Sequence, residues 1–142
     1  LLADASLRPT PADIAFARDA FLDLLAIRAS STLFRLRTAA DIQQRLSFPN
    51  TGPAQNAVVL VGHLNGCGYA GANFQELLYF INVDKVTQTI ALPELAGKTF
   101  QLHPAQARAE AADARVRNTA AVDRASGRFT VPARSAVVYV VP

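Results

Sequence analysis

The chain has 142 residues, of which 51% are hydrophobic and 18% charged, a composition of one globular domain, or one domain plus a piece of another. The net charge of +3 comes mostly from arginines that are scattered and do not cluster with aromatic residues in any stretch, so we expect no nucleic-acid partner. A single cysteine excludes an internal disulfide and a cysteine-based zinc cluster, and no apolar run approaches the roughly 20 residues that span a bilayer.

The pattern of residues 10–28 predicts one helix. Thr10 can cap it, Pro11 suits the first helical position, and Asp13 stands three residues after the cap. Because apolar residues lie on more than one side, we expect this helix to be buried between two layers, one of them outside the chain. The absence of methionine, even at position 1, predicts an excised segment, so that any targeting sequence would lie outside it.

Short apolar runs separated by turn residues fill the rest of the chain. Residues 32–36 read as extended and residues 38–42 as one helical turn. Residues 104–117 stay ambiguous, because they are alanine-rich but have a thin apolar face. Many short strands predict an antiparallel β-sandwich or a barrel. The expected strands are 43–48, 57–64, 77–83, 87–92, 98–102, 120–122, 128–131 and 135–141.

Residues 66–71, GCGYAG, complete a G-x-G-x-x-G pattern after a predicted strand. A dinucleotide-binding turn needs its first glycine directly after the strand, then a helix, then an acid about 20 residues on, for which Asp84 is the candidate. Residues 63–65 intervene, however, and ELLYFINV favours a strand over a helix. We therefore interpret residues 66–71 as a flexible hairpin connection, with dinucleotide binding as the weaker alternative.

Other site patterns are weak. Cys67 and His63 are close enough in sequence to be a nucleophile and its base, but no third orienting group is evident. His63 and His103 have no carboxylate at metal-ligand spacing, and we expect His103 to be a surface or hydrogen-bonded residue. We expect the acidic residues, Asp23 among them, to lie on solvent-exposed faces. We predict no catalytic, metal or cofactor site.

Glucan binding would need exposed aromatic side chains. Most aromatic residues fall in apolar runs and are expected in the core: Phe48, Tyr79, Phe80, Phe129 and Tyr139. Tyr69 and Phe74, beside the glycine-rich segment, form the plausible exposed pair and are our candidate glucan contacts.

Five segments carry a family resemblance. These are LAIR (25–28), LFRL (33–36) and RLSFPNTG (45–52), followed by LLYFINVDKVTQTIALPELAGKTFQLHPAQA and the closing GRFTVPARSAVVYV. In this order and spacing, from about Pro9 to Val141, they resemble the C-terminal region of pullulanase-type α-1,6-glucosidases of the α-amylase superfamily. The segment NGCGYAGANFQE matches no signature of that family.

The resemblance implies a mainly β fold. Residues 1–31 would be the end of a catalytic (β/α)8 barrel, with its last helix at about 10–28. Residues 32–142 would be an antiparallel β-sandwich of the amylase C-terminal type, preceded by that one α-helix.

The resemblance also implies a role. The family hydrolyses α-1,6 branch points in pullulan, amylopectin and limit dextrins, with an Asp nucleophile and a Glu acid/base whose motifs lie upstream of such a segment. None occurs here, so no catalytic residue carries over. We expect a non-catalytic accessory domain that needs no cofactor and no membrane, with the barrel of the same polypeptide as partner. The alternative is a glucan-binding module.

Overall fold

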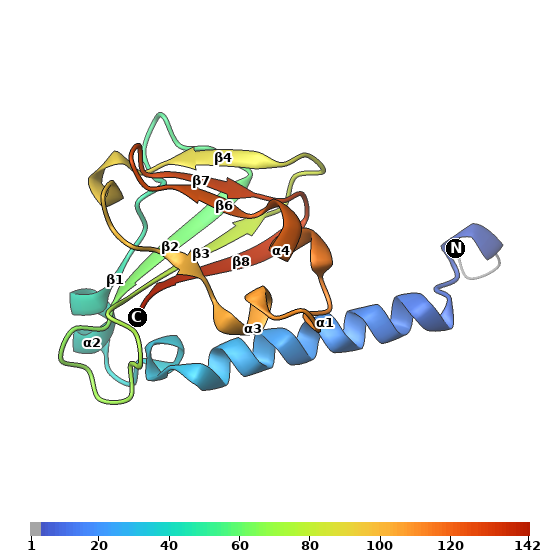
Figure 1. The fold of residues 1–142 in the computed structure, drawn as a ribbon, viewed down its shortest axis with the longest axis horizontal. Coiled ribbons are helices and arrows are strands. Elements are labelled where there is room, and N and C mark those ends of the chain that lie inside the picture. Colours follow the sequence, from blue (N-terminus) through green and yellow to red (C-terminus); the bar gives the residue numbers. More distant parts are fainter. Residues whose placement is uncertain (1–3) are drawn as a thin grey trace.

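The computed structural model describes residues 4–142, an antiparallel β-sandwich with a long helix along one side (Figure 1). No helix within that range is long and apolar enough to cross a membrane. In chain order the elements are η1 (Ala5–Leu7), α1 (Pro11–Ser30), η2 (Thr32–Arg35), α2 (Ala39–Arg45), β1 (Leu46–Ser47), β2 (Val59–Asn65), β3 (Glu76–Asn82), β4 (Gln88–Ala91), η3 (Pro93–Leu95), β5 (Gln101–Leu102), α3 (Pro104–Ala107), α4 (Ala114–Thr119), β6 (Ala121–Asp123), β7 (Arg128–Val131) and β8 (Ser135–Val141).

Helix α1 begins where its cap predicts. The Thr10 hydroxyl accepts a hydrogen bond from the Asp13 amide at 3.2 Å, and the Asp13 carboxylate accepts one from the Thr10 amide at 2.8 Å. This reciprocal pair satisfies two amides that the first helical turn leaves free. The helix ends at Ser30, two residues beyond the predicted end, because Ser31 is extended.

Two antiparallel sheets form the sandwich. The larger has the strand order β1-β2-β3-β8-β5 and the smaller β4-β7-β6. Strands β2, β3 and β8 pair over seven residues each, with Leu78 opposite both His63 and Tyr139. The sheet prediction is confirmed, and the predicted strand 135–141 has the observed bounds.

The space between the sheets is filled by aromatic rings. The Phe129 ring lies 5.3 Å from Phe80, 5.7 Å from Phe100 and 5.4 Å from Tyr139, and all four side chains are buried. The Tyr139 hydroxyl donates to the carbonyls of Ala121 and Thr130, so its polar atom is satisfied. We call this cluster the inter-sheet core.

A second cluster lies on the outer face of the larger sheet. Ile27 of α1 and Leu33 of η2 pack there against Leu64, Leu77 and Val140. These strand residues alternate with those of the inter-sheet core, because successive side chains of a strand point to opposite faces. We call this cluster the outer core; it joins the C-terminal end of α1 to the sandwich.

Some predicted elements were wrong. Residues 32–36 are not extended: the Ser31 hydroxyl accepts from the Leu33 amide at 3.1 Å and caps the 3-10 turn η2. The ambiguous segment 104–117 holds two short helices, α3 and α4, capped by His103 and Asp113. Residues 43–48 form the end of α2 and the short β1, and Phe48 is 44% exposed, outside the core.

Candidate functional site

The glycine-rich segment connects two neighbouring antiparallel strands. Residues 66–75 lead from β2 to β3, and β3 is a strand where a dinucleotide site needs a helix. The dinucleotide alternative is therefore wrong, and the interpretation as a hairpin connection is confirmed. Gly71 has a φ of +73°, and a Cβ there would lie 2.8 Å from Thr32 Cγ2, so this position requires glycine.

The connection is fastened to the chain at the end of α1. The Ala72 carbonyl accepts from the Ser31 hydroxyl at 2.6 Å, and the Ala70 carbonyl accepts from the Thr32 hydroxyl at 2.7 Å. The Thr32 amide donates to the Gly71 carbonyl at 3.0 Å. The connection lies beside the C-terminal end of α1 (Figure 1). The bonds join segments about 40 residues apart in the sequence, so the connection is not the flexible loop that we expected.

Cys67 and His63 are not paired as a nucleophile and its base would be. Cys67 is exposed, and its carbonyl accepts from Arg45 Nη1 at 2.9 Å. The His63 ring is directed to Glu76, with 2.7 Å between Nε2 and Oε2. Lys98 Nζ also binds the Glu76 carboxylate, at 2.6 and 2.7 Å. The three side chains therefore form a local ion network.

That network holds Glu76 ionised. Burial opposes its ionisation, but the hydrogen bonds and charges of Lys98 and His63 outweigh it and keep the pKa of Glu76 below its usual value. A general acid for glycoside hydrolysis needs the opposite, a raised pKa. Within residues 4–142 no group of three or more His, Cys, Asp or Glu side chains could hold a metal ion.

Tyr69 and Phe74, the predicted glucan contacts, are both half-buried and both pack against the outer core. The Phe74 ring meets the His103 ring edge-on at 5.4 Å. The Arg45 guanidinium lies over the Tyr69 ring, 4.6 Å from its centroid. The two rings are thus placed separately, and they do not share one open platform.

Two buried polar residues tie α1 to the sandwich, and the sequence analysis anticipated only the hydrogen bonding of His103. Asp23 accepts from the Arg108 guanidinium and, at 2.7 Å, from the Ala112 amide, so it is not a solvated acid. His103, expected to lie at the surface or to be hydrogen-bonded, is buried and hydrogen-bonded, with its Nε2 2.9 Å from the Ser30 hydroxyl. A histidine before Pro104 was a weak signal for a helix cap.

The His103 ring has a defined tautomer. Its Nδ1 accepts from the Ala105 amide at 3.1 Å, so the proton is on Nε2, which donates to Ser30. The Ser30 hydroxyl in turn donates to the Ile27 carbonyl at 2.7 Å. Burial disfavours the charged form of the ring and lowers the pKa of His103 from 6.5 to about 4.

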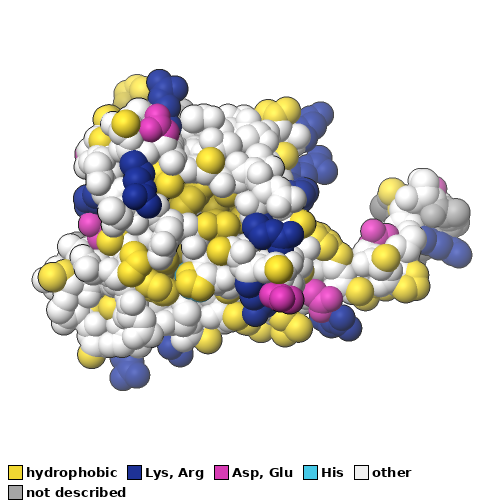
Figure 2. Space-filling view, viewed as in Figure 1, with side chains coloured by type: hydrophobic (Ala, Val, Ile, Leu, Met, Phe, Trp, Pro, Cys, Tyr) yellow, Lys and Arg dark blue, Asp and Glu magenta, His cyan; other side chains and the backbone are white. Residues whose placement is uncertain are grey.

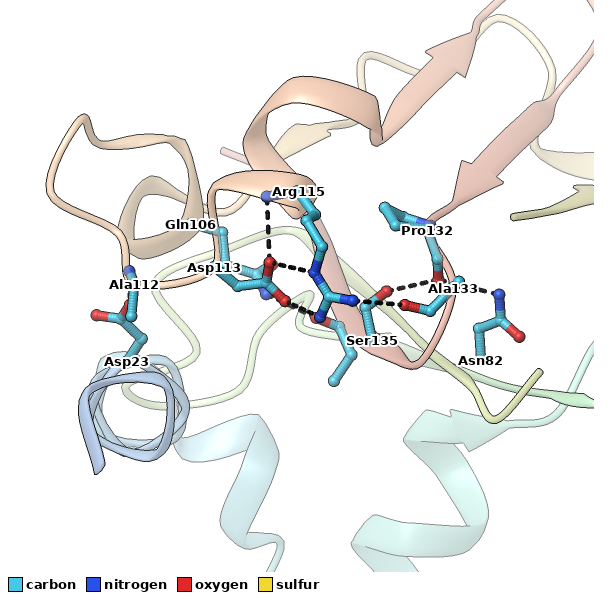
Figure 3. A network of polar contacts seen from close by, with 10 residues as sticks. Asp23, Asn82, Gln106, Ala112, Asp113, Arg115, Pro132, Ala133 and Ser135 are labelled. Carbon is cyan, nitrogen blue, oxygen red and sulfur yellow. Dashed lines mark hydrogen bonds and ion pairs between the residues drawn. The ribbon is translucent and has the colours of Figure 1, made fainter. Parts of the chain in front are cut away.

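Polar contacts surround the segment where the chain passes from β7 of the smaller sheet to β8 of the larger sheet (Figure 3). Asn82 is 2% exposed and donates to the carbonyls of Val131 and Pro132. Asp113 accepts from two nitrogens of Arg115, at 2.9 and 2.7 Å. The Gln106 amide group donates to the Ala136 carbonyl and accepts from the Val138 amide, which extends the pairing of β8 beyond β5.

A surface hollow lies where the glycine-rich connection meets η2. It is lined by Thr32, Arg35, Arg37, Tyr69 and Ala70. Both arginines are exposed, and neither side chain has an ion-pair or hydrogen-bond partner within residues 4–142.

Exposed hydrophobic side chains lie along α1, including its side that faces away from the sandwich (Figure 2). Six large hydrophobic side chains of this helix are 42–60% exposed: Ile14, Phe16, Phe21, Leu22, Leu24 and Leu25. The prediction of a helix apolar on more than one side is confirmed. On its sandwich side the helix buries Asp23 and Ile27, and Phe16 and Leu24 line a hollow between the helix and the sandwich.

Comparison with known proteins agrees with this architecture. The chain is 36% identical over 146 residues to pullulanase 1, chloroplastic, of Arabidopsis thaliana, which covers 98% of the chain and 15% of that protein. It is 31% identical over 124 residues to pullulanase of Klebsiella pneumoniae, covering 86% of the chain and 11% of that protein. The crystal structure of PulA from Klebsiella oxytoca superposes with a TM-score of 0.77 at 29% identity, covering 94% of the chain and 13% of PulA.

The chain thus spans 11–15% of the length of these relatives. A family model described as "Alpha-1,6-glucosidases, pullulanase-type, C-terminal" matches residues 1–142. The antiparallel sandwich, the preceding helix and these matches together show that the chain belongs to the pullulanase-type α-1,6-glucosidase C-terminal family.

Proposed function

We propose that the chain is a non-catalytic accessory domain of a longer starch- or pullulan-debranching polypeptide, and that it packs on the catalytic barrel and stabilises it. The open apolar side of α1 carries this proposal. Proteins rarely expose a contiguous apolar patch of this kind unless another surface covers it. Ile14, Phe21 and Leu25 give the patch large side chains that are 43–60% exposed, and full burial of such a side chain contributes about 1.5–3 kcal/mol.

The opposite side of the helix explains why the barrel would gain stability from the sandwich. Asp23, Ile27 and Ser30 hold α1 to the sandwich through an ion pair, the outer core and the His103 contact. A helix that is anchored to the sandwich on one side and apolar on the other can pack against the sandwich and the barrel at the same time. Unfolding of the barrel would then have to detach or unfold the sandwich as well.

The carboxylates support the absence of catalysis. Glu76 is paired with Lys98, Asp23 with Arg108 and Asp113 with Arg115. Hydrogen bonds from Arg115 outweigh burial and keep the pKa of Asp113 below its usual value. Retaining glycosidases need one carboxyl group that is protonated before the reaction, and the lowered pKa values of Glu76 and Asp113 oppose protonation.

The test of the accessory role uses the longer polypeptide. Phe21→Gln, on the open side of α1, should lower the melting temperature of the catalytic part. Val86→Gln, which alters an equally exposed hydrophobic residue outside α1, should leave it unchanged. Equal effects of the two variants would contradict packing through α1.

A second assay addresses catalysis. The 142-residue chain, purified to homogeneity, should leave pullulan intact. Release of reducing ends that survives a further purification step would contradict the non-catalytic assignment.

The second candidate function is glucan binding. Tyr69 favours it, since this ring lines a surface hollow, whereas Phe74 packs edge-on against His103. Retardation of the chain in a gel that contains amylopectin would support binding. Migration at the same rate with and without the polysaccharide would exclude it.

A further inference from the structure

We propose that the hollow between η2 and the glycine-rich connection binds a neutral α-glucan chain, with Arg35 and Arg37 as hydrogen-bond donors and Tyr69 as the apolar wall. The inference rests on the proposed function, because a debranching polypeptide acts on such chains. It assigns a role to the connection that the family resemblance leaves unexplained. The cavity volume of ≈ 400 Å³ falls within the range of about 300–1,000 Å³ that small-molecule sites have.

The floor of the hollow is held in place before any ligand arrives. The Thr32 hydroxyl and amide donate hydrogen bonds to the carbonyls of Ala70 and Gly71. Any side chain at position 71 would clash with Thr32, so only glycine fits there. Two lining residues, Thr32 and Ala70, are thus fixed directly to each other. A site that is fixed in advance loses little conformational entropy when it binds.

The Tyr69 ring is fixed by a cation. Arg45 lies 4.6 Å from the ring centroid and donates through Nη1 to the carbonyls of Asn65 and Cys67, at 3.2 and 2.9 Å. The guanidinium therefore links the ring to the backbone on either side of Gly66. Held in this way, Tyr69 can offer apolar ring surface to the C–H groups of a sugar without first losing rotamer freedom.

The two arginines supply the polar part. Each guanidinium carries five N–H donors, and those of Arg35 and Arg37 have no acceptor within residues 4–142. An α-glucan presents closely spaced hydroxyl oxygens as acceptors beside apolar C–H surfaces. Donors next to an aromatic wall match this ligand better than they match a bare anion, which has no surface for the ring to contact.

The experiment is a titration of the 142-residue chain with maltoheptaose, followed by NMR. We expect saturable shifts at the amides of Thr32 and Ala70 and at the side-chain Nε–H groups of Arg35 and Arg37. The double variant Arg35→Gln/Arg37→Gln should weaken binding at least about tenfold, since hydrogen bonds from charged groups contribute about 1.5–3 kcal/mol. Arg124→Gln, in an exposed turn, should bind like the unaltered chain.

Two changes at Tyr69 separate the ring from its hydroxyl. Tyr69→Phe should keep the affinity within about threefold, whereas Tyr69→Ala should weaken it about tenfold or more. Because Tyr69→Ala also removes the contact with Arg45, its melting temperature is measured as well. If that variant unfolds, the arginine double variant, which leaves the ring and Arg45 in place, decides the question.

Three results would overturn the proposal. One is the absence of saturable shifts up to about 10 mM maltoheptaose, which would fill a site of millimolar affinity. Another is a set of shifts confined to other residues. The third is displacement of maltoheptaose by inorganic phosphate at equal concentration, which would make the hollow an anion site. None of these results affects the Phe21→Gln test, so failure here is distinguishable from failure of the accessory role.

Discussion

The inter-sheet core and the layer formed by α1 are built on opposite principles. The rings of Phe80, Phe129 and Tyr139 are enclosed by both sheets, and their one polar atom is satisfied. Helix α1 buries Asp23 and Ile27 against the sandwich, but it exposes Phe21 and other large apolar side chains on its other side. The first region is complete within the chain, and the second is half of an interface.

This difference separates what stabilises the fold from what the fold offers to a partner. Substitutions in the inter-sheet core should act on the chain itself. Those on the open side of α1 should act mainly in the longer polypeptide. Residues that join α1 to the sandwich, such as His103 and Ser30, should give intermediate and condition-dependent effects.

The largest effect is expected for Phe129→Ala. Phe129 is fully buried and contacts three other rings, so its truncation should reduce the free energy of unfolding by about 3–5 kcal/mol. Urea denaturation followed by circular dichroism measures the change. Phe48→Ala is the matched control, because this ring is already 44% exposed and should cost far less. Similar losses for the two variants would contradict a closed inter-sheet core.

The next effect is a dependence on pH at the joint between α1 and the sandwich. The pKa of His103 is about 4 in the folded chain and near 6.5 when unfolded, so the unfolded chain binds the proton more tightly. The stability from neutral His103 is therefore complete above pH 6.5 and is lost as the pH falls toward 4. The full loss is about 3 kcal/mol.

The control for this prediction is His103→Asn, which keeps a helix-capping side chain but cannot titrate. Urea denaturation at pH 7 and pH 4.5 should show a smaller pH-dependent loss for the variant than for the unaltered chain. Equal losses would assign the pH dependence to the carboxylates instead of to His103.

The smallest effect on stability is expected for Phe21→Gln in the isolated chain. Phe21 is 60% exposed, so the free energy of unfolding should change by no more than about 0.5 kcal/mol. Self-association, measured by sedimentation at high protein concentration, should decrease because the apolar patch becomes smaller. A loss of stability as large as that of Phe129→Ala would show that α1 is closed on both sides.

The regular elements were largely predictable. The cap at Thr10, the alternation in β2 and β3, and the apolar run of β8 are local patterns, and local patterns report secondary structure directly. Residues 32–36 were misassigned because their apolar content resembles a strand. The 3-10 turn depends on the Ser31 side chain, which the apolar pattern does not reveal.

The candidate site was far less predictable. Tyr69 and Phe74 are five residues apart, but one ring meets Arg45 and the other meets His103. The hollow joins Arg35 and Arg37 to a connection more than 30 residues away. No spacing in the sequence indicates such a meeting, since it depends on how the end of α1 passes the β2–β3 hairpin.

The sequence by itself determined the long helix, the strands and the family. Caps and alternation depend on neighbouring residues, and the order of segments can be seen along the chain. The tertiary structure alone decided which polar groups became structural. Asp23, His103 and Gln106 look like ordinary polar residues, and each is buried because a distant segment supplies its hydrogen bonds. Burial and pairing arise when segments far apart in the chain pack together, and a linear pattern carries no record of that packing.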